Sequence, residues 1–355
     1  MSPLLLLMWL GATSHVPAVP AVPDTHAAPP PAVTVPLADF PKFDSTTSLL
    51  IVAPHPDDET LCCAGVIQRV TAAGGKVGVV WITSGDASEM DLLVIEKSLF
   101  RKPRKLRDLA ERRMQEAHAA AGVLGIPPAR QIFLGYPDRG VLSLLGEHYV
   151  TPFYSKFNGS SVVPYDNALS PGQPYTGRSL EHDFDSVLQR LEPTLVLAPS
   201  PRDAHSDHEA AGILAMRAMS QRGELSRLRY WIVHGGETWP LPRGYHPTRK
   251  AYPSPRAKGL ASGAFELTPQ EEQRKLQALQ SYQTQMKIMS SYLLAYVRSS
   301  ELYSDTPMPP PGPGQELPPE ADAPAATPAS VADPGETDPA TSTAPAATPE
   351  GSLAK

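Results

Sequence analysis

The chain has 355 residues, of which 41% are hydrophobic and 19% charged, and its formal net charge is −6. Residues 1–305 carry 30 basic and 30 acidic residues, so the negative charge comes from the sequence after Asp305. A neutral body with no stripe of Lys and Arg lacks the electrostatic footprint of a nucleic-acid-binding protein. The two adjacent cysteines, Cys62 and Cys63, exclude a disulfide scaffold, and we expect them to be small core residues rather than a redox pair.

Residues 1–36 are predicted to be a leader outside the folded core. A run of about eight to ten apolar residues opens the chain; it is too short to span a bilayer but is typical of a secretory signal peptide. Pro- and Ala-rich sequence follows, with 8 of the 41 prolines before Leu37. We therefore expect export to the periplasm, the envelope or the outside of the cell. Because no Lys or Arg precedes the apolar run, a disordered leader on a cytoplasmic protein is the alternative.

Apolar runs alternate with helical patterns between the leader and the tail. The runs typical of buried parallel strands are 48–53, 76–83, 131–136, 194–198 and 229–234. The helical patterns are 59–73, 105–124, 180–191, 208–222 and 269–297. Such repeated β–α units predict an α/β fold in a single domain over residues 37–304, with an open, mostly parallel, Rossmann-like sheet and helices on both faces. Two loops, 87–104 and 146–175, are longer than such units need, and loops of this kind set substrate choice.

Residues 305–355 form the last predicted segment. Thirteen prolines follow Asp305, and the segment has no aromatic residue. It cannot bury enough apolar surface to offset the entropy of ordering, so we expect a disordered acidic tail. No segment after the leader predicts a transmembrane helix.

Two polar clusters, residues 54–59 and 201–208, directly follow predicted strands 48–53 and 194–198. In open parallel sheets ligands bind beyond the carboxyl ends of the strands, so the two clusters are expected to share one crevice. Two histidines and a carboxylate are a common ligand set for a catalytic zinc that keeps its fourth position for water. A further carboxylate can take the proton of that water as it attacks a carbonyl. The pattern favours metal-assisted hydrolysis of an amide or ester.

A simpler explanation exists for each cluster taken alone. An Asp-Asp pair such as Asp57 and Asp58 at a helix start is usually an N-cap that interacts favourably with the helix dipole, and Glu59 suits the same first turn. Asp207 is placed to cap the helix that begins near His208. The joint position of both clusters after two apolar strands favours the shared site.

Residues 53–60, which read APHPDDET, closely resemble the signature of the PIG-L/LmbE-like family of metal-dependent N-acetylglucosaminyl deacetylases. One residue departs from the usual form, since Pro54 stands where Ala is common; it should stiffen the turn without removing a ligand. The resemblance covers roughly residues 46–303. Further blocks in family order are TSGD at 83–86, RMQE at 113–116, LGYPD at 134–138, HSDH at 205–208, VHGG at 233–236 and YQTQ at 282–285.

The resemblance implies roles for the residues at the matching positions. His55, Asp58 and His208 would be the metal ligands, and Asp57 would be the general base on the metal-bound water that attacks the amide carbonyl. The implied ion is Zn²⁺, with Fe²⁺ as the alternative.

Four other residues also receive implied roles. His205 would stabilise the oxyanion or act as general acid, and Asp207 would orient a histidine by hydrogen bonding. Arg113 and Asp138 align with positions that contact the sugar. Their simpler explanations are a solvated charge on a helix for Arg113 and a turn residue for Asp138. His234 ends a strand near the crevice, and a structural role is favoured for it.

The resulting hypothesis is a zinc-dependent hydrolase of a linear amide bond that removes the acetyl group from an N-acetylated amino sugar in a small molecule or glycoconjugate. A non-catalytic carbohydrate-binding or envelope-interaction module on the same fold is the alternative, but such a module has no need of both the ligands and a free base. A non-haem Fe(II) oxygenase would also use two His and one carboxylate. The α/β alternation and the free carboxylate argue against it.

Overall fold

A computed structural model describes residues 40–87, 103–236 and 238–304. The predicted leader (1–36) and tail (305–355), and with them the expectation of export, lie outside these residues and stay predictions. Most of the predicted loop 87–104 lies outside them too. Within the described part, no helix has the length and apolar character needed to cross a membrane.

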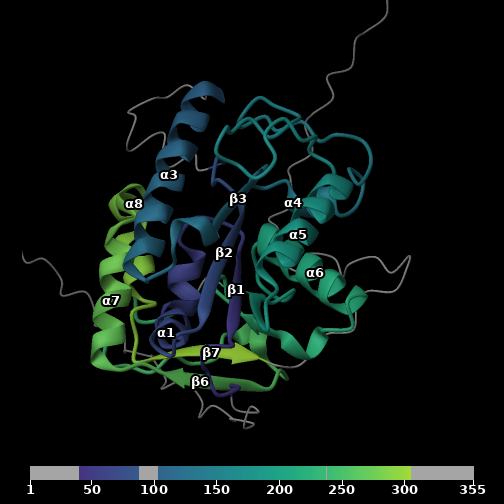
Figure 1. The fold of residues 1–355 in the computed structure, drawn as a ribbon. Helices are drawn as coiled ribbons and strands as arrows, with labels where there is room; N and C mark the ends of the chain where they lie inside the picture. The colour runs from purple at the N-terminus through teal and green to yellow at the C-terminus, as the bar shows by residue number, and fades with distance from the viewer. Residues whose placement is uncertain (1–39, 88–102, 237, 305–355) are drawn as a thin grey trace, which may run out of the picture. The chain divides into compact units, whose positions relative to one another are not determined.

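A seven-stranded sheet is the centre of the fold (Figure 1). Its strand order is β3-β2-β1-β4-β5-β7-β6, in which the first five strands are parallel and β7 and β6 are antiparallel. Its strands are β1 (Ser48–Ala53), β2 (Lys76–Thr83), β3 (Gln131–Tyr136), β4 (Leu195–Pro199), β5 (Leu228–Trp231), β6 (Ser262–Glu266) and β7 (Ser300–Ser304). The apolar runs form the parallel strands because these are covered on both faces, and every residue of β1 is buried. The predicted mostly parallel α/β sheet is confirmed.

Helices cover both faces of the sheet, as predicted. In Figure 1, α1, α3, α7 and α8 lie on one side and α5 and α6 on the other. The helices are α1 (Asp58–Ala72), α3 (Pro103–Val123), α4 (Val141–Leu144), α5 (Gly177–Leu191), α6 (Ser206–Gln221), α7 (Pro269–Gln280) and α8 (Gln283–Leu294). Short 3₁₀ turns occupy Pro128–Arg130, Leu225–Arg227 and Pro255–Ala257.

Three features at the C-terminal side differ from the sequence prediction. The predicted helix 269–297 is two helices, because Tyr282 leaves the helical conformation and its buried ring enters the core. The short strands β6 and β7 were not predicted. They carry no continuous apolar run, since β6 is a partly exposed edge and β7 holds the buried Glu301, whose charge is paired with Lys275.

The cysteines are buried in α1, as expected for core residues. They nevertheless form a disulfide between Cys62 and Cys63, which the sequence interpretation did not anticipate. Because the bridge joins sequence neighbours, it links no separate elements.

The strand order places the switch point of the sheet at β1. Chain connections run from β1 to β2 on one side and reach β4 on the other, so a crevice opens beyond the carboxyl ends of β1 and β4. Both polar clusters of the sequence follow these two strands.

Candidate metal centre

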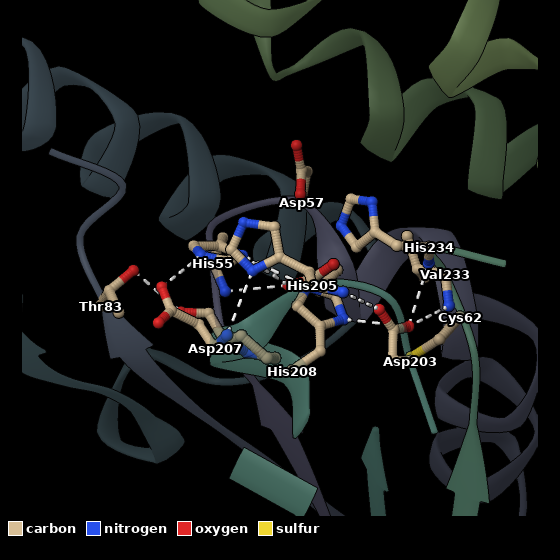
Figure 2. Close-up of polar contacts among 12 residues, drawn as sticks. His55, Asp57, Cys62, Thr83, Asp203, His205, Asp207, His208, Val233 and His234 are labelled. Carbon is tan, nitrogen blue, oxygen red and sulfur yellow. Dashed lines mark hydrogen bonds and ion pairs between the residues drawn. The ribbon is translucent and has the colours of Figure 1, made fainter. Parts of the chain in front are cut away.

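The two clusters meet beyond the sheet. Figure 2 shows the imidazoles of His55, His205 and His208 gathered with Asp207 and Asp203, while Asp57 stands apart from them. The first cluster is the turn between β1 and α1, and the second is the loop between β4 and α6.

Three donor atoms form a nearly regular triangle. His55 Nδ1 lies 3.3 Å from His208 Nε2, His208 Nε2 lies 3.2 Å from Asp58 Oδ2, and Asp58 Oδ2 lies 3.4 Å from His55 Nδ1. Two ligands held about 2.0–2.1 Å from a tetrahedral ion are about 3.3 Å apart, so the spacing fits a single divalent cation. His55 with His205 and His208, and His208 with Asp58 and His234, are also close enough to hold an ion. The structure thus brings together the three predicted ligands, and their role as ligands stays a prediction.

The charges of the three groups compensate one another. Burial lowers the pKa of His208, but Asp58 and Asp203 outweigh it and raise the pKa to about 9. Burial likewise disfavours charge on His55, whereas Asp138, Asp207 and Asp58 raise its pKa well above the usual range. Burial opposes the ionisation of Asp58, yet His208 and His55 hold its pKa well below the usual range. Without a cation, protons on the histidines balance the carboxylates.

Asp57 differs from its neighbour Asp58. Its backbone φ of 118° lies in the left-handed region that side chains rarely occupy. Its carboxylate makes no hydrogen bond within the part of the chain that the structure describes. Burial and the charge of Asp58 raise the pKa of Asp57 well above its usual range, against the opposing effect of Arg113. A buried carboxylate of this kind is disposed to accept a proton.

Neither Asp57 nor Asp207 caps a helix with its side chain, although acidic residues of both clusters lie in the first helical turns, where the helix dipole favours them. Asp57 occupies the N-cap position of α1 without a side-chain capping bond. The N-cap of α6 is His205, whose Nδ1 accepts a hydrogen bond from Asp207 N at 3.2 Å.

Asp207 lies behind His55 instead. Its Oδ2 is 3.2 Å from His55 Nε2 and accepts a hydrogen bond of 2.6 Å from Arg139 N, and its Oδ1 accepts one from Val141 N. A carboxylate on the far nitrogen of a metal-binding imidazole fixes the ring and its tautomer. The contact has the geometry expected for Asp207, and its role in orienting His55 stays a prediction.

Sequence reasoning missed the equivalent partner of His208. Asp203 Oδ2 lies 3.3 Å from His208 Nδ1 and accepts hydrogen bonds from Val233 N and His234 N at 2.9 and 3.0 Å. Burial opposes its ionisation, but the charge of His208 lowers the pKa of Asp203 to about 2. The only feature of the sequence that pointed to Asp203 was its place in the loop that contains the HSDH motif.

We expect Asp203→Asn to weaken zinc binding about ten- to hundredfold, because His208 loses the carboxylate that orients it. Competition titration with a zinc chelator would measure the change. The exposed Asp166 provides the matched control, and Asp166→Asn should bind zinc like the parent chain. Equal affinity of the Asp203 and Asp166 variants would contradict an orienting role.

A pocket of about 140 Å³ opens over the donor triangle. Its lining includes the polar side chains of Arg113, Asp138 and Arg139 and the apolar side chains of Leu61 and Met289. Arg113 is only 6% exposed, which excludes its being a solvated charge. Asp138 is buried in the pocket wall, where burial opposes its charge but His55 lowers its pKa, so it is more than a turn residue.

His205 and His234 also line the pocket. Burial and the positive charge of His55 and His208 lower the pKa of His205 to about 4, and burial and His208 lower that of His234 to about 3. Both rings are therefore neutral at pH 7. His234, for which a structural role was favoured, packs 4.5 Å from His208 between ring centres and belongs to the site.

The insertion 146–175 is anchored beside the pocket. Asp86 Oδ2 accepts hydrogen bonds from Asn158 and Tyr165 of the insertion at 2.6 and 2.7 Å, and Asp86 Oδ1 accepts one from Asp138 N. Burial and the charge of Asp138 raise the pKa of Asp86 from 3.8 to about 6.

This shift predicts a pH-dependent stability. The folded chain binds the Asp86 proton more tightly than the unfolded chain, so the stabilisation is full below about pH 4 and is lost as the pH rises through about 6. The loss is at most about 3 kcal/mol of unfolding free energy. Urea unfolding of the metal-free parent and of Asp86→Asn between pH 4 and 7 would measure it. The variant should lack this part of the slope, and parallel curves would contradict the prediction.

Fold and site together define the class of protein, an α/β domain with a cluster of His and Asp side chains that can hold a divalent metal ion at the switch point of the sheet. Residues 50–219 match the family model PIG-L, GlcNAc-PI de-N-acetylase. This match confirms the resemblance to the PIG-L family that is seen in the motifs of the chain.

Two curated relatives illustrate the similarity. A diacetylchitobiose deacetylase of Thermococcus kodakarensis is 25% identical over 184 residues, which are 51% of this chain and 52% of that protein. A 1D-myo-inositol 2-acetamido-2-deoxy-alpha-D-glucopyranoside deacetylase of Kribbella flavida is 26% identical over 199 residues, which are 56% of this chain and 60% of that protein. The chain thus aligns with 52–60% of the length of these relatives. Among solved structures, the A40926 pseudoaglycone deacetylase Dbv21 is 19% identical, with a TM-score of 0.47 over 73% of this chain and 96% of that one.

Proposed function

We propose that this chain is a zinc-dependent hydrolase that removes the N-acetyl group from an N-acetylglucosamine-containing substrate. The observation that carries the proposal is the donor triangle of His55, Asp58 and His208 beside a carboxylate, Asp57, whose oxygens make no hydrogen bond among the described residues. Two histidines and a carboxylate suit zinc, and Fe²⁺ is the alternative ion. The deacetylase names of the two relatives support the choice of an acetylated amino sugar.

A divalent cation at the triangle would polarise the amide carbonyl and make a water molecule more acidic. Asp57 takes a proton from the attacking water, because its raised pKa and free oxygens make it the available base in the pocket. As the C–N bond breaks, the same proton passes from Asp57 to the departing amine nitrogen. The products are acetic acid and the free amino sugar, and the acid then releases its proton to the amine or to solvent to give acetate, so atoms and charge balance.

His205 stabilises the oxyanion that forms on the carbonyl. Its Nδ1 accepts the hydrogen bond from Asp207 N, so in the neutral ring the proton is on Nε2. A neutral imidazole can donate that N–H to a developing negative charge. Its low pKa of about 4 disfavours the other predicted role, that of general acid.

The polar lining residues of the pocket bind the sugar. Arg113 and Asp138 offer a donor and an acceptor for hydroxyl groups, and the buried Nε of Arg113 has no hydrogen-bond partner in the described residues. Unlike the polar sugar, the acetyl methyl group is suited to the apolar lining residues Leu61 and Met289.

The test is acetate release by the zinc-loaded full chain from free N-acetylglucosamine, an N-acetylglucosamine glycolipid and an N-acetylated oligosaccharide. Release of acetate with an equal amount of free amine is the expected result, and the preferred conjugate would identify the substrate class. Zinc binding without acetate release from any conjugate would overturn the proposal and favour a carbohydrate-binding module.

A further inference from the structure

One peptide unit of the site is held at both of its ends. Pro56 O accepts hydrogen bonds from Gln285 Nε2 at 3.2 Å and from Arg113 Nη2 at 3.3 Å. On the other side of the same peptide plane, Asp57 N donates to Glu59 Oε2 at 3.4 Å. The partners come from α8, α3 and α1, so elements far apart in the sequence meet on the Pro56–Asp57 peptide.

This peptide determines the conformation of Asp57. Rotating its plane changes φ of Asp57, which has the left-handed value of 118° that a non-glycine residue adopts only when its surroundings impose it. Pro56 has no N–H to contribute. Backbone hydrogen bonds from Thr60 N and Leu61 N to Asp57 O hold the following peptide, and the three side-chain contacts hold the preceding one.

Two of the three partners, Glu59 and Gln285, are buried and are themselves held by further hydrogen bonds. Glu59 is fully buried, and its carboxylate also accepts hydrogen bonds from Trp81 Nε1, Thr60 Oγ1 and the hydroxyl of Tyr282. Gln285 is 1% exposed, and Thr284 lies in hydrogen-bond contact with its Oε1, which directs its Nε2 toward Pro56. Neither residue lines the pocket over the donor triangle.

We propose that Gln285 and Glu59 are positioning residues that clamp the Pro56–Asp57 peptide and thereby hold Asp57 in its left-handed conformation, aimed into the pocket. The proposal rests on the proposed function for its kinetic consequence only, because the conformation of Asp57 can be tested without any substrate. Tyr282 and Gln285 lie beyond residues 50–219, so α8 contributes to the site from outside the part that matches the family model.

The first test is kinetic and uses the zinc-loaded full chain. Gln285→Met keeps the size of the side chain but removes the donor, and we expect kcat to fall about ten- to hundredfold with KM and zinc affinity unchanged. Gln283→Met is the matched control, because Gln283 is exposed on the same helix and should tolerate the change. A variant with weakened zinc binding, or a control that loses as much activity, would overturn the proposal.

A double-mutant cycle separates positioning from a general structural role. If Gln285 acts through Asp57, then Gln285→Met should cause no further loss of kcat in a chain that already carries Asp57→Asn. If Gln285→Met lowers kcat by the same factor in the parent and in the Asp57→Asn chain, Gln285 does not act through the base. If Gln285→Met does not fold, Gln285→Asn withdraws the amide by one methylene and tests the same contact.

The second test needs no activity. With a φ of 118° at this position, Asp57→Gly should melt several degrees above Asp57→Ala, because glycine tolerates the conformation and alanine does not. This difference in melting temperature should become smaller when Gln285→Met is added to both variants, since the released peptide can rotate. An unchanged difference would refute the clamp even if acetate release is confirmed, whereas a smaller difference would support it even if no conjugate is cleaved.

Discussion

Asp57→Asn is expected to lower kcat for acetate release at least about a hundredfold while zinc stays bound, because the amide cannot take the proton of the attacking water. The substitution should not unfold the chain. Burial and Asp58 make the charged form of Asp57 unfavourable in the folded state, so a neutral side chain of the same shape should keep or raise the melting temperature.

The measurement compares single-turnover acetate release with zinc content and thermal melting for the same preparations. Asp58→Asn is the matched comparison, since it removes the neighbouring charge with the same change of side chain. We expect it to lose zinc, whereas Asp57→Asn should keep it. An Asp57→Asn chain within about threefold of the parent in kcat would exclude general-base catalysis by this residue.

The parallel part of the fold could be predicted because its strands are covered on both faces and therefore read as continuous apolar runs. The antiparallel edge could not be predicted, because β7 contains a buried carboxylate, Glu301. This carboxylate is paired with Lys275, which lies 26 residues away in the sequence. A charged residue in a five-residue strand interrupts the apolar run that would indicate a buried strand, and the sequence does not show that Lys275 neutralises it. The break at Tyr282 is similar, because its cause is a contact with Glu59, 223 residues away.

The candidate site shows the same division. His55, Asp58 and His208 belong to short motifs after apolar strands, so their meeting follows from topology alone. The roles of Asp203 and Glu59 depend on which atom each carboxylate reaches. Asp203 lies in the predicted cluster, yet nothing in the sequence shows that it turns to His208 Nδ1. Glu59 suits a first helical turn, but it points into the core and not toward solvent.

Loss of a triangle ligand should remove the metal and with it the activity. His208→Gln leaves Asp58 and Asp203 buried without the cation or the protonated ring that balances them. We expect zinc affinity to fall by more than about a hundredfold, beyond the range for an outer partner such as Asp203. The metal-free variant should also melt below the metal-free parent, because an unpaired buried carboxylate is costly.

Chelator competition and inductively coupled plasma analysis of the purified full chain would measure zinc binding, and the exposed His182 supplies the control variant His182→Gln. Stoichiometric zinc in His208→Gln with parental affinity would place the cation at the neighbouring group that does not include His208, which is His55, Asp138, His205 and Asp207. Comparing the loss of zinc affinity in His208→Gln with that in Asp203→Asn therefore distinguishes a residue that binds the metal from one that orients a ligand. A ligand contributes the bond to the metal itself, whereas the carboxylate beside its far nitrogen contributes only the direction of the ring.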